Sequence, residues 1–181
     1  MRTHANPHHT IRHLVFSALC LGLCLVLPFL TGQIPQIGSM LCPMHIPVLL
    51  AGFLCGPWWA MAVGLVTPTL RYVLFSMPPL MPVGLAMTFE LAAYGLTAGL
   101  LHRVLPKNTL CIYTALIGAM LTGRMVWGIA CFFIYGAMGI TFTWPIFLAG
   151  AFVNAIPGII VHIVIIPAIV LALKQTNLLT D

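Results

Sequence analysis

The chain has 181 residues, of which 61% are hydrophobic and only 5% are charged, and its net charge is +5. A soluble domain carries roughly 25% charged residues because its surface must meet water, so this composition excludes a soluble globular protein. It predicts an all-α integral membrane protein with a single domain over residues 1–181, too short to add a separate soluble domain.

Six apolar segments follow one another, each bounded by Pro, Gly or polar residues. The apolar run of the first segment, about seventeen residues, is longer than a signal-peptide core, and no A-x-A cleavage pattern follows it, so we expect a retained helix. The second segment, about thirteen residues, is too short for an upright span and must be partial, tilted or stacked against partners. We expect the six helices over residues 11–29, 44–56, 58–75, 80–101, 110–137 and 144–173.

Basic residues outside these segments predict the topology. Loops near residues 31–43, 75–80 and 137–144 contain no Lys or Arg, and cytoplasmic loops are the ones that collect them. Six crossings therefore place both termini in the cytoplasm. The basic residues are markers of this topology and do not form a nucleic-acid-binding surface: Arg2, Arg12, Arg103, Lys107 and Lys174.

Three charged residues lie inside the apolar segments: Arg71, Glu90 and Arg124. A charge at that depth is costly and normally faces the bundle interior beside a partner. We expect Glu90 and Arg124 to pair near mid-membrane, which leaves Arg71, nearer the outer end of its helix, as a surplus positive charge. An anionic ligand would balance it, because a guanidinium binds a carboxylate through two N–H groups. The alternative is that the three groups pair only with one another.

Polar and aromatic residues near these charges are further candidates for a binding pocket. Trp127 shares a helix face with Arg124, and His45 lies at the outer start of the second helix. Asn154 precedes Pro157, whose ring removes a helix hydrogen bond and frees a carbonyl. Simple packing explains Trp127 about as well, and a hydrogen bond at the membrane interface explains His45.

Small residues at four-residue spacing let membrane helices approach closely. Ala18 and Gly22 form such a pair in the first segment, whose other faces are Leu, Val and Phe, so this pair is the best candidate for contact with another subunit. His162 and the six cysteines are expected to be packing residues. No metal-binding spacing, nucleotide-binding loop or catalytic motif is present, so we expect neither an enzyme nor a cofactor in this chain.

Two longer stretches resemble a known family. PMHIPVLLAGFLCGP (residues 43–57) and MPPLMPVGLAMTFELAAYG (residues 77–95) are similar to the substrate-binding S component of energy-coupling factor (ECF) vitamin transporters. The resemblance implies a six-helix bundle in the cell membrane that captures a vitamin at the extracellular side. It also implies reorientation on a transmembrane scaffold subunit, driven by two cytoplasmic ATPases that use ATP. Members commonly contact the scaffold through an A-x-x-x-A stripe, where this chain has Ala18 and Gly22.

Within the family, the stretches are most similar to members for pantothenate or of unassigned substrate. Pantothenate carries one carboxylate, consistent with a surplus intramembrane arginine, whereas a thiamine-type cation is disfavoured; biotin, folate and riboflavin stay open. A structural or assembly protein with an internal ion pair, or a stand-alone secondary transporter, are the other functions considered. The expected substrate-binding residues are His45, Arg71, Glu90, Arg124, Trp127 and Asn154.

Overall fold

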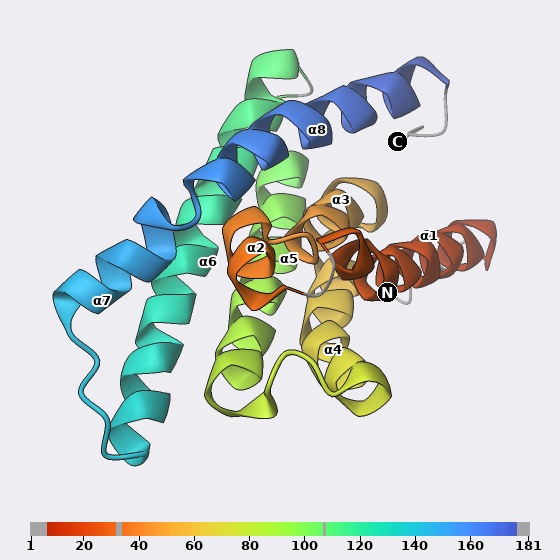
Figure 1. The fold of residues 1–181 in the computed structure, drawn as a ribbon. Helices are drawn as coiled ribbons and strands as arrows, with labels where there is room; N and C mark the ends of the chain where they lie inside the picture. The colour runs from red at the N-terminus through yellow and green to blue at the C-terminus, as the bar shows by residue number, and fades with distance from the viewer. Residues whose placement is uncertain (1–6, 32–33, 107, 177–181) are drawn as a thin grey trace, which may run out of the picture.

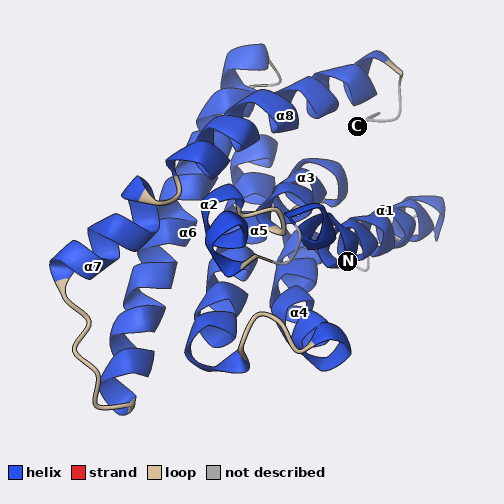
Figure 2. Cartoon of the chain, viewed as in Figure 1, coloured by secondary structure: helices blue, strands red, loops and turns tan. Residues whose placement is uncertain are grey.

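A computed structural model describes the protein over residues 7–31, 34–106 and 108–176. These residues form helices joined by short loops, with no strand among them (Figures 1 and 2). Two of the expected topology markers, Arg2 and Lys107, lie outside these residues. In chain order the helical elements are α1 (Pro7–Val26), the 3-10 turn η1 (Leu27–Thr31), α2 (Pro35–Leu41), α3 (His45–Cys55), α4 (Pro57–Phe75), the π-helical turn η2 (Leu80–Gly84), α5 (Leu85–Val104), α6 (Thr109–Ala137), α7 (Trp144–Leu148), the π-helical turn η3 (Ala149–Val153) and α8 (Ile156–Gln175).

Local backbone chemistry sets the boundaries around α3. Cys42 ends α2 in the left-handed region (φ 48°, ψ 52°), and its N–H bonds back to the Gly38 carbonyl. Gly56 separates α3 from α4 at φ 86°, a conformation that glycine adopts without steric cost. Pro57 then occupies the first turn of α4, where a missing N–H leaves no helical bond unmade.

Helix α5 lies in the middle of the bundle, packed against α3, α4 and α6 (Figure 1). Its contact with α4 is made by backbone: a Cβ placed on Gly64 of α4 would lie under 3.0 Å from the Leu91 and Ala92 backbone, and one placed on Gly95 would overlap Ala60. In lipid there is little hydrophobic drive between helices, so close approach of small residues supplies the association. This contact fixes the position of α5 against α4.

The C-terminal part of the chain is a broken helix made of α7, η3 and α8, which runs across the bundle in Figure 1. The break lies in η3, where the Asn154 N–H bonds to the Ala149 carbonyl five residues back. Helix α8 packs closely on the end of α2, since a Cβ on Gly158 would meet the Met40 carbonyl oxygen at 2.6 Å. The crossing brings α8 beside the start of α3.

The six expected helices are all present, with boundaries shifted by a few residues. The link after residue 31, where we expect a loop from the sequence, holds an additional helix, α2. Among the described residues, four helical stretches are long and apolar enough to cross a membrane: Thr10–Thr31, Leu80–Val104, Thr109–Ala137 and Trp144–Gln175. Helix α3 has 11 residues, about 16 Å, and α4 is not among the four. The count of six crossings and the cytoplasmic termini stay predictions.

Candidate functional site

A buried ion pair joins the two central helices. Glu90 of α5 is 1% exposed and Arg124 of α6 is 7% exposed. Arg124 Nη1 donates to Glu90 Oε1 at 2.8 Å. Removing one partner of such a pair would leave an uncompensated buried charge, which costs about 3–5 kcal/mol. The pairing expected from the sequence is confirmed.

His45, in the first turn of α3, lies beside the same carboxylate. Its Nε2 atom is 3.4 Å from Glu90 Oε2, close enough for electrostatic attraction but without the geometry of a hydrogen bond. The ring packs edge-on against Tyr94, with centroids 5.1 Å apart, and stacks on the His162 ring of α8, with centroids 6.1 Å apart. His45 is therefore enclosed between α5 and α8.

Cys42 connects this region to the end of α2. Its Sγ atom lies 3.5 Å from Arg124 Nη2, and its carbonyl accepts the His45 N–H at 3.0 Å. The Cys42 backbone also hydrogen bonds with the His162 ring. The left-handed backbone costs of order 1–3 kcal/mol for a residue other than glycine, and these contacts on three helices offset that cost. We call the following residues the polar cluster: Cys42, His45, Glu90, Tyr94, Arg124 and His162.

The polar cluster combines one carboxylate, one guanidinium and two imidazoles from four helices: α3, α5, α6 and α8. With neutral imidazoles its net charge is zero, because Glu90 and Arg124 balance. Tyr94 interacts with the Glu90 carboxylate from one turn further along α5. Among the described residues, no three His, Cys, Asp or Glu are arranged to hold a metal ion. The arrangement is suited to bind polar groups of a small molecule through hydrogen bonds.

Arg71 lies apart from the polar cluster, between α1 and α4. Its Nη1 atom donates to the Leu25 carbonyl, and its guanidinium carbon lies 5.2 Å and 5.4 Å from the ring centroids of Phe29 and Phe75. Helix α1 tightens into the 3-10 turn η1 at this point, and Pro28 within that turn has no backbone N–H. Carbonyl groups in the preceding turn of α1 are therefore left without a backbone hydrogen-bond donor. Arg71 replaces one of those donors and adds no positive charge to the cluster.

Trp127 and Asn154 also lie outside the polar cluster. Trp127 packs against Phe142 and Phe147, with ring centroids 6.1 Å and 6.3 Å away. Asn154 is exposed immediately after η3. The helix break that we expect from Pro157 lies earlier in the chain, in the π-helical turn η3. Pro157 itself lies in the first turn of α8, where its missing N–H breaks no helical hydrogen bond.

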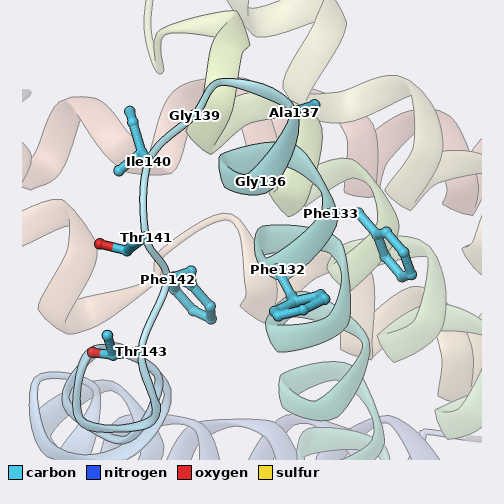
Figure 3. A pocket seen from close by; sticks show the side chains of 9 residues that line it. All are labelled: Phe132, Phe133, Gly136, Ala137, Gly139, Ile140, Thr141, Phe142 and Thr143. Atoms are coloured by element: carbon cyan, nitrogen blue, oxygen red, sulfur yellow. The ribbon is translucent and has the colours of Figure 1, made fainter.

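Two adjoining hollows lie at the α6–α7 connection. The larger, about 640 Å³, is lined by Phe132 and Phe133 of α6 and by the following loop. The second, about 420 Å³, continues past Phe142 to Trp144 and Phe147. In Figure 3 the Phe142 ring points from the loop toward Phe132. Both hollows are open and mainly apolar and contain no member of the polar cluster, so we place the candidate site at the cluster.

Two members of the polar cluster, Cys42 and His162, were not among the binding residues predicted from the sequence. A third, Tyr94, was predicted to share a helix face with Glu90 but was not proposed as a binding residue. Cys42 and His162 were both expected to be packing residues, and Tyr94 was the residue aligned with Glu90. For His162 a signal existed, since it is a polar ring within an otherwise apolar helix. For Cys42 no local signal separates it from the other cysteines, because its role depends on a left-handed cap.

Comparison with known proteins identifies the family of the chain. A family model described as "ECF transporter, substrate-specific component" matches residues 12–170, a range that includes every member of the polar cluster. No curated protein and no solved structure matches the chain. The family consists of transporter components, and the four apolar helical stretches fit a multi-pass membrane protein. The chain belongs to the family of ECF transporter substrate-specific components.

Proposed function

We propose that the chain is the substrate-capture subunit of an ATP-driven ECF importer in the cell membrane. It binds a small vitamin at the extracellular side and delivers it by reorientation on a transmembrane scaffold subunit. Two cytoplasmic ATPases hydrolyse the ATP, since the sequence has no nucleotide-binding loop of its own. The observation that carries the proposal is the family match over residues 12–170.

The polar cluster is the proposed inner wall of the substrate site. His45, Glu90 and Arg124 are the expected binding residues that the fold brings together. In this arrangement Glu90 holds Arg124 in place, and the buried imidazoles carry ring nitrogens without a hydrogen-bond partner. Variants of the more distant Trp127 and Asn154 test whether the site extends beyond the cluster.

Pantothenate is the vitamin we propose first. The support is the resemblance of residues 43–57 and 77–95 to pantothenate-type members. Arg71 is bonded to the Leu25 carbonyl and lies apart from the cluster, so a surplus of arginine no longer argues for an anionic substrate. Biotin, folate, riboflavin and thiamine therefore belong in the same binding panel.

A small-residue face on α1 is the proposed contact with the scaffold subunit. Ala18 and Gly22 are exposed, and a Cβ on Gly22 would meet no atom within 4 Å. Helices in membranes approach closely where such residues align. The face is therefore free to receive a helix of another subunit.

Calorimetric titration of the detergent-purified chain with the five vitamins tests the proposal. We expect saturable binding of one vitamin, and uptake into proteoliposomes only when the scaffold and both ATPases are present. Uptake by this chain alone would contradict the proposal and would support a secondary transporter instead.

The Glu90–Arg124 pair also favours a second candidate, a structural or assembly protein whose buried charges serve only the fold. Under that function no vitamin would raise the unfolding temperature. Replacing Arg124 with Ala would then lower stability and change no binding property. A ligand-induced thermal shift across the panel distinguishes the two functions.

A further inference from the structure

Two histidines from distant parts of the chain meet in the polar cluster. His45 begins α3 and His162 lies in α8, and each is 2% exposed. Their rings stack with centroids 6.1 Å apart and planes inclined by 22°. Packing alone does not require imidazoles at these positions, because apolar rings of similar size would stack equally well.

Unpaired nitrogens are concentrated on these two rings. Of the four buried side-chain nitrogen or oxygen atoms without a hydrogen-bond partner among the described residues, three are His45 Nδ1, His45 Nε2 and His162 Nε2. Buried polar atoms are normally paired, and exceptions in a native fold call for a specific explanation such as a bound molecule. His45 Nε2 already faces Glu90 Oε2 at 3.4 Å, so the two nitrogens left for a bound molecule are His45 Nδ1 and His162 Nε2.

The hydrogen-bond environment determines which of these nitrogens accept. The Cys42 N–H is already bonded to Gly38, so the carbonyl is the group that hydrogen bonds with the His162 ring. A carbonyl only accepts, which puts the ring proton on that side and leaves His162 Nε2 as an acceptor. In the neutral form of His45, the nearby Glu90 carboxylate favours the proton on Nε2, which leaves Nδ1 as an acceptor.

Two acceptor nitrogens, on His45 and His162, beside the Glu90 carboxylate favour some ligand groups over others. They attract hydroxyl or amide N–H groups, and they disfavour a ligand carboxylate. Arg124 is the cation of the cluster, and its two terminal nitrogens already contact Glu90 and Cys42. We propose that His45 and His162 select the substrate through its hydroxyl donors, and that the carboxylate of the substrate is bound elsewhere. This inference rests on the proposed function.

A double-mutant cycle between protein and ligand tests it. The probes are pantothenate, its dideoxy analogue without hydroxyls, and panthenol, in which an alcohol replaces the carboxylate. His162→Phe keeps an aromatic ring and removes the acceptor, whereas His162→Gln keeps an acceptor. His102→Phe is the matched control, because His102 packs edge-on against Phe53 and is not a member of the polar cluster.

We expect His162→Phe to weaken pantothenate binding about 10-fold or more and to leave binding of the dideoxy analogue within about 2-fold. The ratio of the dissociation constants of panthenol and pantothenate should be the same in the wild-type protein and in His162→Phe. His162→Gln should recover most of the affinity for pantothenate. If His162→Phe does not fold, as judged by thermal unfolding, His45→Phe carries the same expectation.

The inference is overturned if His162→Phe weakens the binding of pantothenate and of its dideoxy analogue by the same factor. It is also overturned if His162→Phe changes the binding of pantothenate and of panthenol by different factors, because His162 would then interact with the carboxylate. In either case the proposed function stands, because the wild-type chain binds the vitamin. If the wild-type chain binds no vitamin of the panel, the proposed function fails and the inference fails with it.

Discussion

Arg124 donates one hydrogen bond to Glu90 and directs its other terminal nitrogen to Cys42, so a single guanidinium joins α6 to both α5 and the end of α2. The Glu90 carboxylate in turn lies beside His45 of α3. Because a carboxylate is costly to bury alone in a membrane protein, these contacts depend on one another.

Removing one charge of the pair should cost more than removing both. Arg124→Met leaves the Glu90 carboxylate buried without its cation, which should lower the free energy of unfolding by about 3–5 kcal/mol. Glu90→Leu combined with Arg124→Met removes both charges and should recover at least half of that loss. Denaturant unfolding in detergent measures the three proteins. A double variant less stable than either single variant would contradict this explanation.

Arg71 should matter for stability and not for ligand affinity. Arg71→Gln removes the bond to the Leu25 carbonyl and both ring contacts, with an expected cost of about 1.5–3 kcal/mol. The dissociation constant of the bound vitamin should change less than about 2-fold. Arg103→Gln, at an exposed site on α5, is the control for loss of one arginine. A large loss of affinity at unchanged stability would return Arg71 to the substrate site.

Backbone contact between α4 and α5 should make two glycines intolerant of a methyl group. Gly64→Ala and Gly95→Ala each place a Cβ under 3.0 Å from backbone atoms, and such overpacking typically costs about 1–3 kcal/mol. Gly22→Ala and Gly136→Ala meet no atom within 4 Å and serve as matched controls. Thermal unfolding of the four variants should divide them into these two pairs.

Enlarging the small-residue face of α1 should block transport and spare binding. Gly22→Leu fills the face proposed for the scaffold, so vitamin binding by the isolated chain should be unchanged while uptake with the scaffold and ATPases is lost. Ala168→Leu enlarges an exposed position on α8 and should reduce neither property. Equal uptake by the two variants would move the scaffold contact away from this face.

Thiol labelling checks the expected topology. In a Cys111→Ser background, Thr141→Cys on the α6–α7 loop should react with a membrane-impermeant maleimide added outside cells. Asn108→Cys, before α6, should react only after permeabilisation. Both native residues are exposed. Labelling of both from the same side would exclude a crossing by α6.

Much of the fold could be predicted because apolar segments and their Pro and Gly boundaries are local signals. The boundary at Gly56 and Pro57, for example, follows from the backbone chemistry of two adjacent residues. Helix α2 was missed because it has seven residues and lies in a link with few long apolar runs. Membrane crossing by α3 and α4 could not be decided, since neither is both long and strongly apolar.

The candidate site was predictable only in part. Glu90 and Arg124 stood out because charge is rare in these segments, and their pairing follows from its cost. The position of Arg71 could not be foreseen, because it depends on a carbonyl left without a backbone donor near Pro28. The roles of Cys42 and His162 arise from the crossing of α8 over the α2–α3 turn, a contact between residues 120 positions apart.

The contact of α4 with α5 has a mechanical consequence. Across this interface backbone meets backbone at Gly64 and Gly95, so no side chain can change rotamer to let one helix slide past the other. The two helices must translate and tilt together as one body. Any reorientation of the protein in the membrane would therefore carry the Glu90 carboxylate along with α4, and relative motion has to be sought in the other helices.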